Sequence, residues 1–191
     1  MDASTLVLIT VVALTVWLAS FVYLKHPSRW ANRSFSIFSL AVAGWTAGTW
    51  AANYFAQAQI GLVLGRVAFA MGILMAYALL IFFHVFPASS TFPRPVLIRV
   101  VGVLAAVLTL ISLTTPWVLT ALTTENGTLR VKYGPLYPLF AVYILGCVGY
   151  TFSIILHKIR LARGVERLQL NYLFAGLIVP GVLATVTNLL I

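Results

Sequence analysis

The chain has 191 residues, of which 62% belong to the apolar set AVILMFWYC and only 8% are charged. An average soluble domain is about 25% charged. Together with a mean hydropathy of +1.04, this composition excludes a soluble globular protein and a disordered chain. The net charge of +9 could attract nucleic acid, but the basic residues lie between long apolar runs and form no patch. Membrane topology accounts for that pattern, so we expect an integral membrane protein in the lipid bilayer with no nucleic-acid partner.

Six apolar runs are long enough to cross a bilayer. A transmembrane helix needs about 20 residues, because a rise of ~1.5 Å per residue has to cover ~30 Å of hydrocarbon. The runs are residues 4–24, 34–55, 60–86, 96–115, 135–156 and 168–191. Their apolar spacing is helical. The sequence therefore predicts one all-α domain over residues 1–191, a polytopic bundle of six transmembrane helices.

The basic residues predict the orientation of this bundle. Nine of the twelve Lys and Arg residues fall in the first, third and fifth connections between the runs or, for Arg99, in the first turn of the run that follows, and the second connection, Ala56–Gln59, has none. By the positive-inside rule the basic connections are cytoplasmic, which places the N-terminus outside. Six spans return the C-terminus to the outside, and the longest connection, Pro116–Gly134, is expected to be an external loop. The expected location is the bacterial inner membrane.

Arg66 is the one basic residue that lies more than one turn inside a predicted span, on its external side. A charge within a span is costly and by default indicates a functional site. No acidic residue lies in any span, so Arg66 could pair with Glu125 or Asp2 from the outer surface, or bind an anionic ligand headgroup. The structural alternative is that its long side chain reaches the membrane interface.

Other polar and aromatic residues are predicted at the level of Arg66. They are Trp45, Trp50, Asn53, Tyr137 and Asn188. An apolar cavity with a few polar groups and one cation would suit a small amphiphilic or anionic ligand. The alternative is an aromatic belt at the outer membrane interface, where Trp and Tyr are enriched.

Small residues predict close helix packing. Gly44 and Gly48, like Gly61 and Gly65, have the small-xxx-small spacing that lets helix backbones approach. This spacing supports packing within the chain, against a membrane partner or in a homodimer, and does not separate the three. Pro180 lies in the middle of the sixth run and is expected to kink that helix.

Catalytic patterns are missing from the sequence, which has no carboxylate pair in a span and no HExxH or GxSxG motif. We therefore expect no enzyme activity, no metal and no cofactor.

His26, His84 and His157 all fall near cytoplasmic ends of the predicted spans. A pair of facing histidines can hold a haem, so an electron carrier that uses His84 is a third option beside the two functions given below.

Several stretches resemble the N-terminal seven-helix membrane region of bacterial sensor histidine kinases, a region that also precedes diguanylate cyclase domains. The stretches are Asn32–Phe35, Gly65–Phe69, Phe83–Pro87, Gly134–Pro138, Arg163–Tyr172 and Thr187–Asn188. They cover nearly the whole chain. The resemblance implies an external N-terminus, seven helices and a cytoplasmic output domain.

Two functions follow from this comparison, because only six spans and no output domain are predicted. The first is a membrane-embedded sensory input domain without its output domain, in which Arg66 and the external helix ends bind the ligand. The second is a small non-catalytic accessory subunit of a larger membrane complex.

Overall fold

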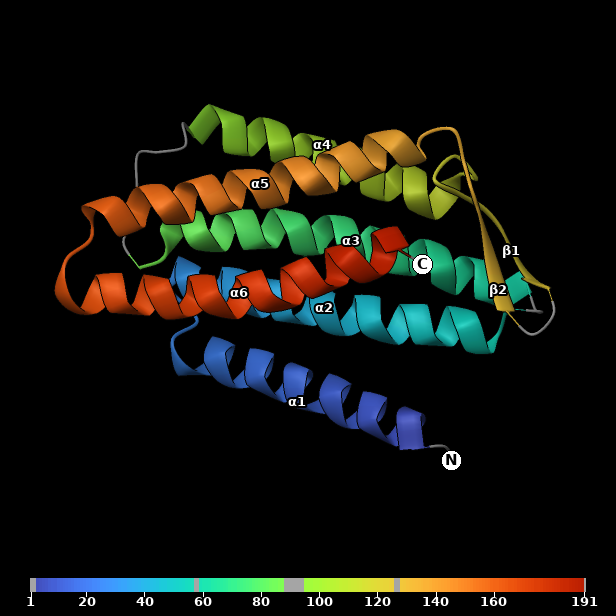
Figure 1. Ribbon diagram of the computed structural model, residues 1–191, viewed down its shortest axis with the longest axis horizontal. Coiled ribbons are helices and arrows are strands. Elements are labelled where there is room, and N and C mark those ends of the chain that lie inside the picture. Colours follow the sequence, from blue (N-terminus) through green and yellow to red (C-terminus); the bar gives the residue numbers. More distant parts are fainter. Residues whose placement is uncertain (1–2, 57–58, 88–94, 126–127, 191) are drawn as a thin grey trace.

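The computed structural model describes residues 3–56, 59–87, 95–125 and 128–190, and within these ranges it leaves out the side chains of residues 3, 95, 124–125, 128–129 and 178–190. Six helices run along one long axis, and a two-stranded hairpin lies at one end (Figure 1). The helices are α1 (Ala3–Lys25), α2 (Trp30–Tyr54), α3 (Gln59–Val85), α4 (Pro95–Thr114), α5 (Tyr137–Leu161) and α6 (Gly164–Leu190). This arrangement confirms the predicted all-α helical bundle.

The most closely packed helix is α3, which contacts α2, α4, α5 and the hairpin. Many of the residues it buries are glycines and alanines, so neighbouring helices approach closely. On α2, Gly44 faces the side chain of Met71, and a Cβ atom added at Gly48 would lie 3.1 Å from the Cβ of Ala68. In this structure, therefore, the Gly44/Gly48 motif lies at the contact between α2 and α3.

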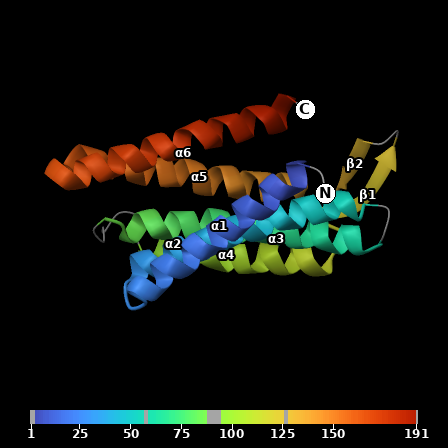
Figure 2. The ribbon, with the colours of Figure 1, turned by 90° about the horizontal axis from the view of Figure 1, so that it is seen from below.

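The two helices that follow the hairpin lie together on one side of α2, α3 and α4 (Figure 2). Phe82 and Phe83 of α3 pack with Ile154 and Ile155 of α5 in the largest buried cluster. Leu173, Phe174 and Leu177 of α6 pack against the same cluster. The first turns of α6 are thus packed near the end of the bundle opposite the hairpin, which we call the far end.

The connection Pro116–Gly134, expected only as an external loop, contains a β-hairpin. Strands β1 (Leu119–Glu125) and β2 (Thr128–Tyr133) pair antiparallel from Leu119↔Tyr133 to Glu125↔Thr128, with an irregularity between Leu119 and Ala121. Their sequences, LTALTTE and TLRVKY, are rich in Thr and Val, which favour extended backbone. Asn126-Gly127 separates the strands in the sequence, and this dipeptide is typical of short hairpin connections.

The connection between the fifth and sixth helices is shorter than the stretch between the fifth and sixth apolar runs. The helix α5 continues to Leu161 and α6 begins at Gly164, whose φ of +57° is a conformation that other residues rarely adopt. Lys158 therefore lies on α5, where it is buried, and not in a loop. Pro180 lies within α6, but its side chain is outside the described part, so the predicted kink stays a prediction.

Among the described residues, four helices are long and apolar enough to cross a membrane. They comprise Ser4–Lys25, Gln59–Val85, Val96–Thr114 and Tyr137–Leu161. These segments belong to α1, α3, α4 and α5, which supports a protein that passes through the membrane several times.

Candidate functional site at the hairpin end of α3

Arg66 joins three elements at the hairpin end of the bundle. Its half-buried side chain donates a hydrogen bond from Nε to the carbonyl oxygen of Leu119 in β1, at 3.4 Å. The buried Ser112 of α4 donates from Oγ to the carbonyl oxygen of Arg66, at 3.2 Å. The first turns of α3 are therefore tied to both α4 and the hairpin.

The hairpin rests directly on α3 beside Arg66. Leu119 is fully buried, and its Cδ2 would lie 2.8 Å from a Cβ atom added at Gly65. The base of the hairpin is closed by two backbone bonds, in which Gly134 N donates to Val118 O at 3.0 Å and Leu136 N donates to Trp117 O at 2.8 Å. The missing side chain at Gly65 is what allows this close contact.

Aromatic rings extend from the hairpin along α3. The rings of Tyr133 and Tyr137 stack with centroids 3.9 Å apart, and Phe69, one turn after Arg66, lies 5.0 Å from Phe140. Phe69 also contacts both tyrosines, at 6.4 and 6.3 Å. We call Phe69, Tyr133, Tyr137 and Phe140 the aromatic cluster. It supplies a large apolar surface with polar hydroxyl groups at one end.

The pKa of the Tyr133 phenol is raised, mainly because burial disfavours the charged form, with a further contribution from Tyr137. The phenol is thus further from titration at neutral pH than an ordinary tyrosine, and it also forms a side-chain hydrogen bond with Tyr137.

Three of the residues singled out in the sequence lie on or beside the same stretch of α3. Tyr137 belongs to the aromatic cluster, which begins one turn from Arg66. Trp45 of α2 reaches the same surface, because its ring and that of Phe140 both lie 3.9 Å from a Cβ atom added at Gly72.

The other predicted residues have contacts elsewhere or lie outside the described part. Trp50 stacks on Tyr54 at 5.4 Å, and Asn53 Nδ2 donates to the carbonyl oxygen of Thr49 at 3.0 Å, both within α2. The side chains of Asn188, Asp2 and Glu125 lie outside the described part, so the suggested pairing of Arg66 with an acid stays a prediction.

Sequence reasoning missed the residues that hold the site together. Leu119 acts through a backbone carbonyl group, which leaves no mark in the sequence, and Ser112 is one of many hydroxyl residues. The ring of Phe69 was detectable, because it follows Arg66 at helical spacing.

At the far end of α3, the basic side chain of Lys158 is held by hydrogen bonds. Lys158 is 8% exposed, and its Nζ donates to the carbonyl oxygens of His84 at 3.0 Å and Phe86 at 2.8 Å. These are carbonyl groups at the C-terminus of a helix, which lack partners within the helix. The helical spacing of Thr151, Ile154, Ile155 and Lys158, which puts them on one face of α5, is the sequence signal that could have predicted a buried Lys158.

Among the described residues, no group of three or more His, Cys, Asp or Glu side chains lies close enough together to bind one metal ion. His84 itself lies in the last turn of α3, and its carbonyl group accepts the bond from Lys158.

Comparison with known proteins identifies the family of the chain. No curated protein and no solved structure matches it. The family model of the N-terminal 7TM region of histidine kinases matches residues 6–190, nearly the whole chain, and confirms the resemblance found in the sequence. The chain belongs to this family of membrane-embedded sensory regions in signal transduction.

Proposed function

We propose that residues 1–191 form the sensory input part of a bacterial sensor kinase in the inner membrane, and that an anionic amphiphile binds at the hairpin end. Arg66 would bind the headgroup, and the aromatic cluster with Trp45 would contact the apolar tail. Binding shifts the bundle only if its affinity differs between two packings of the helices. The chain itself supplies no catalytic step in this proposal.

The observation that carries the proposal is that the Arg66 side chain makes few hydrogen bonds within the described part of the protein. Its Nε makes one long bond to the hairpin, and its Nη groups have no hydrogen-bond partner among the described residues. A guanidinium group pairs with carboxylate or phosphate through two parallel N–H bonds. Such a pair is strengthened where neighbouring protein and lipid lower the dielectric constant.

Six spans with the N-terminus and hairpin outside are part of the proposal. The helix α2 is long enough to cross, but it carries polar residues. Ser34 and Ser36 are buried, and their hydroxyl groups donate to backbone carbonyl oxygens, which removes much of the cost of burying them. The helix α2 also contacts both α1 and α3.

Cysteine labelling tests the orientation. Cys147 is the single cysteine of the chain, so Cys147→Ser provides the background for Thr123→Cys in the hairpin and Ser28→Cys between α1 and α2. Intact spheroplasts are treated with a membrane-impermeant maleimide. We expect label at position 123, and label at position 28 only after permeabilisation. The reverse pattern would contradict the orientation.

Titration with dodecanoate in nanodiscs tests the ligand site. We expect saturable binding to the unmodified protein and at least tenfold weaker binding to Arg66→Gln, because the anion loses its partner. Arg130→Gln, on the exposed side of β2, is the matched charge control and should bind like the unmodified protein. Equal loss in both variants would indicate attraction by net charge alone and would contradict the site.

The second candidate function is the accessory subunit. The observation that favours it is α1, where large side chains such as Leu6, Leu14 and Trp17 are each more than half exposed. A partner helix could cover them, as lipid also could. Purification in mild detergent tests this function, since a subunit should carry a membrane partner in a fixed ratio, whereas a monodisperse single chain would count against it.

A further inference from the structure

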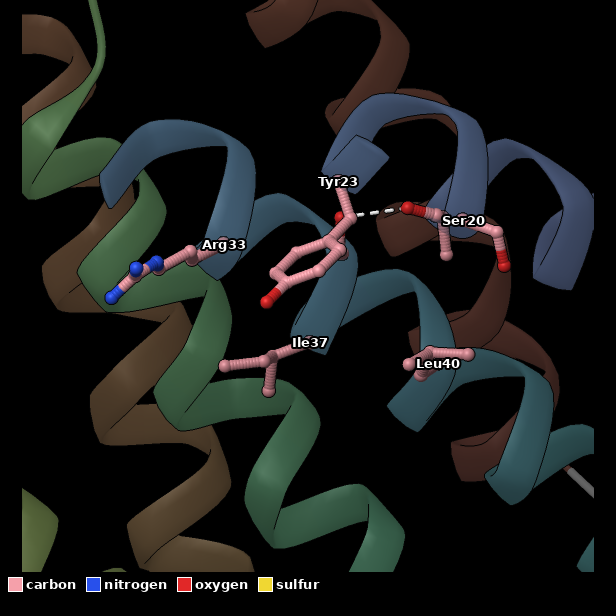
Figure 3. A pocket seen from close by; sticks show the side chains of 7 residues that line it. Ser20, Tyr23, Arg33, Ile37 and Leu40 are labelled. Atoms are coloured by element: carbon pink, nitrogen blue, oxygen red, sulfur yellow. Dashed lines mark hydrogen bonds between the residues drawn. The ribbon is translucent and has the colours of Figure 1, made fainter. Parts of the chain in front are cut away.

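A groove of about 530 Å³ lies between α1 and α2, away from the Arg66 site. Its lining residues are Ala19, Ser20 and Tyr23 from α1, and Arg33, Ser36, Ile37 and Leu40 from α2. Figure 3 shows Arg33 and Leu40 at opposite ends of the groove, with the ring of Tyr23 between them. The groove therefore has a charged residue at one end, and Leu40 with the small hydroxyl residue Ser20 at the other.

Hydrogen bonds between the two helices hold the floor of the groove in place. Ser36 Oγ donates to the carbonyl oxygen of Ala19 at 2.8 Å, and Asn32 Nδ2 donates to that of Val22 at 2.9 Å. Ala19 is 1% exposed and Ser36 is 4% exposed. Because the side chains at the point of contact are small, the groove stays open beside them, and Tyr23 forms one of its walls.

The lining of α2 follows a single helix face. Arg33, Ile37 and Leu40 recur at helical spacing, and seven residues of helix correspond to a rise of about 10 Å. Arg33 lies near the connection between α1 and α2, whereas Ile37 and Leu40 lie deeper along the helix and are about half exposed. A phospholipid has the same order of groups, from a charged headgroup to an apolar chain.

The charge of the groove selects an anion. Arg33 Nε donates to the carbonyl oxygen of Pro27, and among the described residues its Nη groups have no hydrogen-bond partner. Lys25 and Arg29 lie at the same connection but outside the groove lining. Glu166, the one acidic residue with a described side chain, lies in the first turn of α6.

We propose that this groove binds one anionic phospholipid, with its phosphate at the Nη groups of Arg33 and an acyl chain along Ile37 and Leu40. Basic pockets between transmembrane helices favour anionic headgroups, and guanidinium pairs well with phosphate. In the proposed orientation, the lipid belongs to the cytoplasmic leaflet. The lipid site itself does not depend on that orientation or on a ligand at Arg66.

Native mass spectrometry of the purified 191-residue chain tests the site. The protein is equilibrated with equimolar phosphatidylglycerol and phosphatidylcholine of identical acyl chains. We expect one phosphatidylglycerol to be retained at least fivefold more often than phosphatidylcholine. Arg33→Gln should abolish this preference, whereas Arg29→Gln, which removes a nearby charge outside the groove lining, should keep it.

A second variant separates the groove from surface charge. Ser20→Phe places a large ring in the groove without changing any charge, and Thr10→Phe puts the same ring on an exposed position of α1 outside the lining. We expect Ser20→Phe to lose the retained phosphatidylglycerol and Thr10→Phe to keep it. Full retention in Ser20→Phe, or equal losses in Arg33→Gln and Arg29→Gln, would overturn the proposal.

Discussion

At each end of α3, a basic side chain donates hydrogen bonds to backbone carbonyl groups. The two contacts differ in number and length of the bonds. At the far end, the buried Nζ of Lys158 makes bonds of 2.8 and 3.0 Å to the carbonyl groups of Phe86 and His84. At the hairpin end, the half-buried Arg66 makes one bond of 3.4 Å to Leu119. The first cation is held by two short bonds and the second by one long bond.

The difference indicates where the molecule is fixed and where it can respond. Removing one partner from a buried, bonded charge leaves unsatisfied groups and is strongly destabilising. A guanidinium group with uncommitted donors can bind a ligand without first breaking the fold. We therefore propose that the Lys158 contact serves stability and that Arg66 serves ligand binding.

The largest effect is expected from Lys158→Met. The carbonyl groups of His84 and Phe86 lose their buried donor, so the free energy of unfolding should fall by about 2 kcal/mol. Denaturant titration in detergent measures it. Arg160→Gln, an exposed position on the same turn of α5, should change it little. Equal stability of Lys158→Met and the unmodified chain would contradict the assignment.

The next largest loss of stability is expected where the hairpin packs on α3. Gly65→Leu pushes against Leu119 and should cost about 1–2 kcal/mol through overpacking. It should also raise the maleimide labelling rate at Thr123→Cys, because the hairpin is displaced. Gly146→Leu is the matched control, since a Cβ atom there meets nothing within 4 Å. If Gly65→Leu and Gly146→Leu behave alike, the hairpin does not depend on this contact.

Arg66→Gln should change stability less, by about 0.5 kcal/mol, because only one long hydrogen bond is lost. Its main effect is on dodecanoate binding. A loss of stability as large as that of Lys158→Met would show that the two ends do not differ, and that Arg66 is a structural cation as well. Thermal unfolding of both variants in the same nanodiscs makes the comparison.

The smallest effect is expected at Trp50→Phe, which keeps an aromatic ring next to Tyr54. Dodecanoate affinity should stay within twofold of the unmodified protein. Trp45→Phe shortens a ring that reaches the surface of α3 near Gly72 and should weaken binding severalfold. A stronger effect at Trp50 than at Trp45 would move the ligand site away from the aromatic cluster.

The helices were predictable because long apolar runs have few alternatives in a membrane protein. The hairpin was missed because a search for apolar runs passes over strands as polar as TLRVKY. Lys158 was counted with the cytoplasmic bases, although its spacing from Ile154 and Ile155 indicates a buried face. Arg66 was identified by its charge, but its partner, the Leu119 carbonyl group, depends on how the hairpin folds back.

The most direct test compares both ends in one sample. Nuclear magnetic resonance of the chain in nanodiscs, with ¹⁵N-labelled arginine and lysine, follows the side-chain nitrogens of Arg66 and Lys158 as dodecanoate is added. We predict that the Arg66 resonances shift with saturation, while the Lys158 resonance keeps its position. An unchanged Arg66 signal, or equal shifts at both residues, would contradict the assignment of ligand binding to the hairpin end.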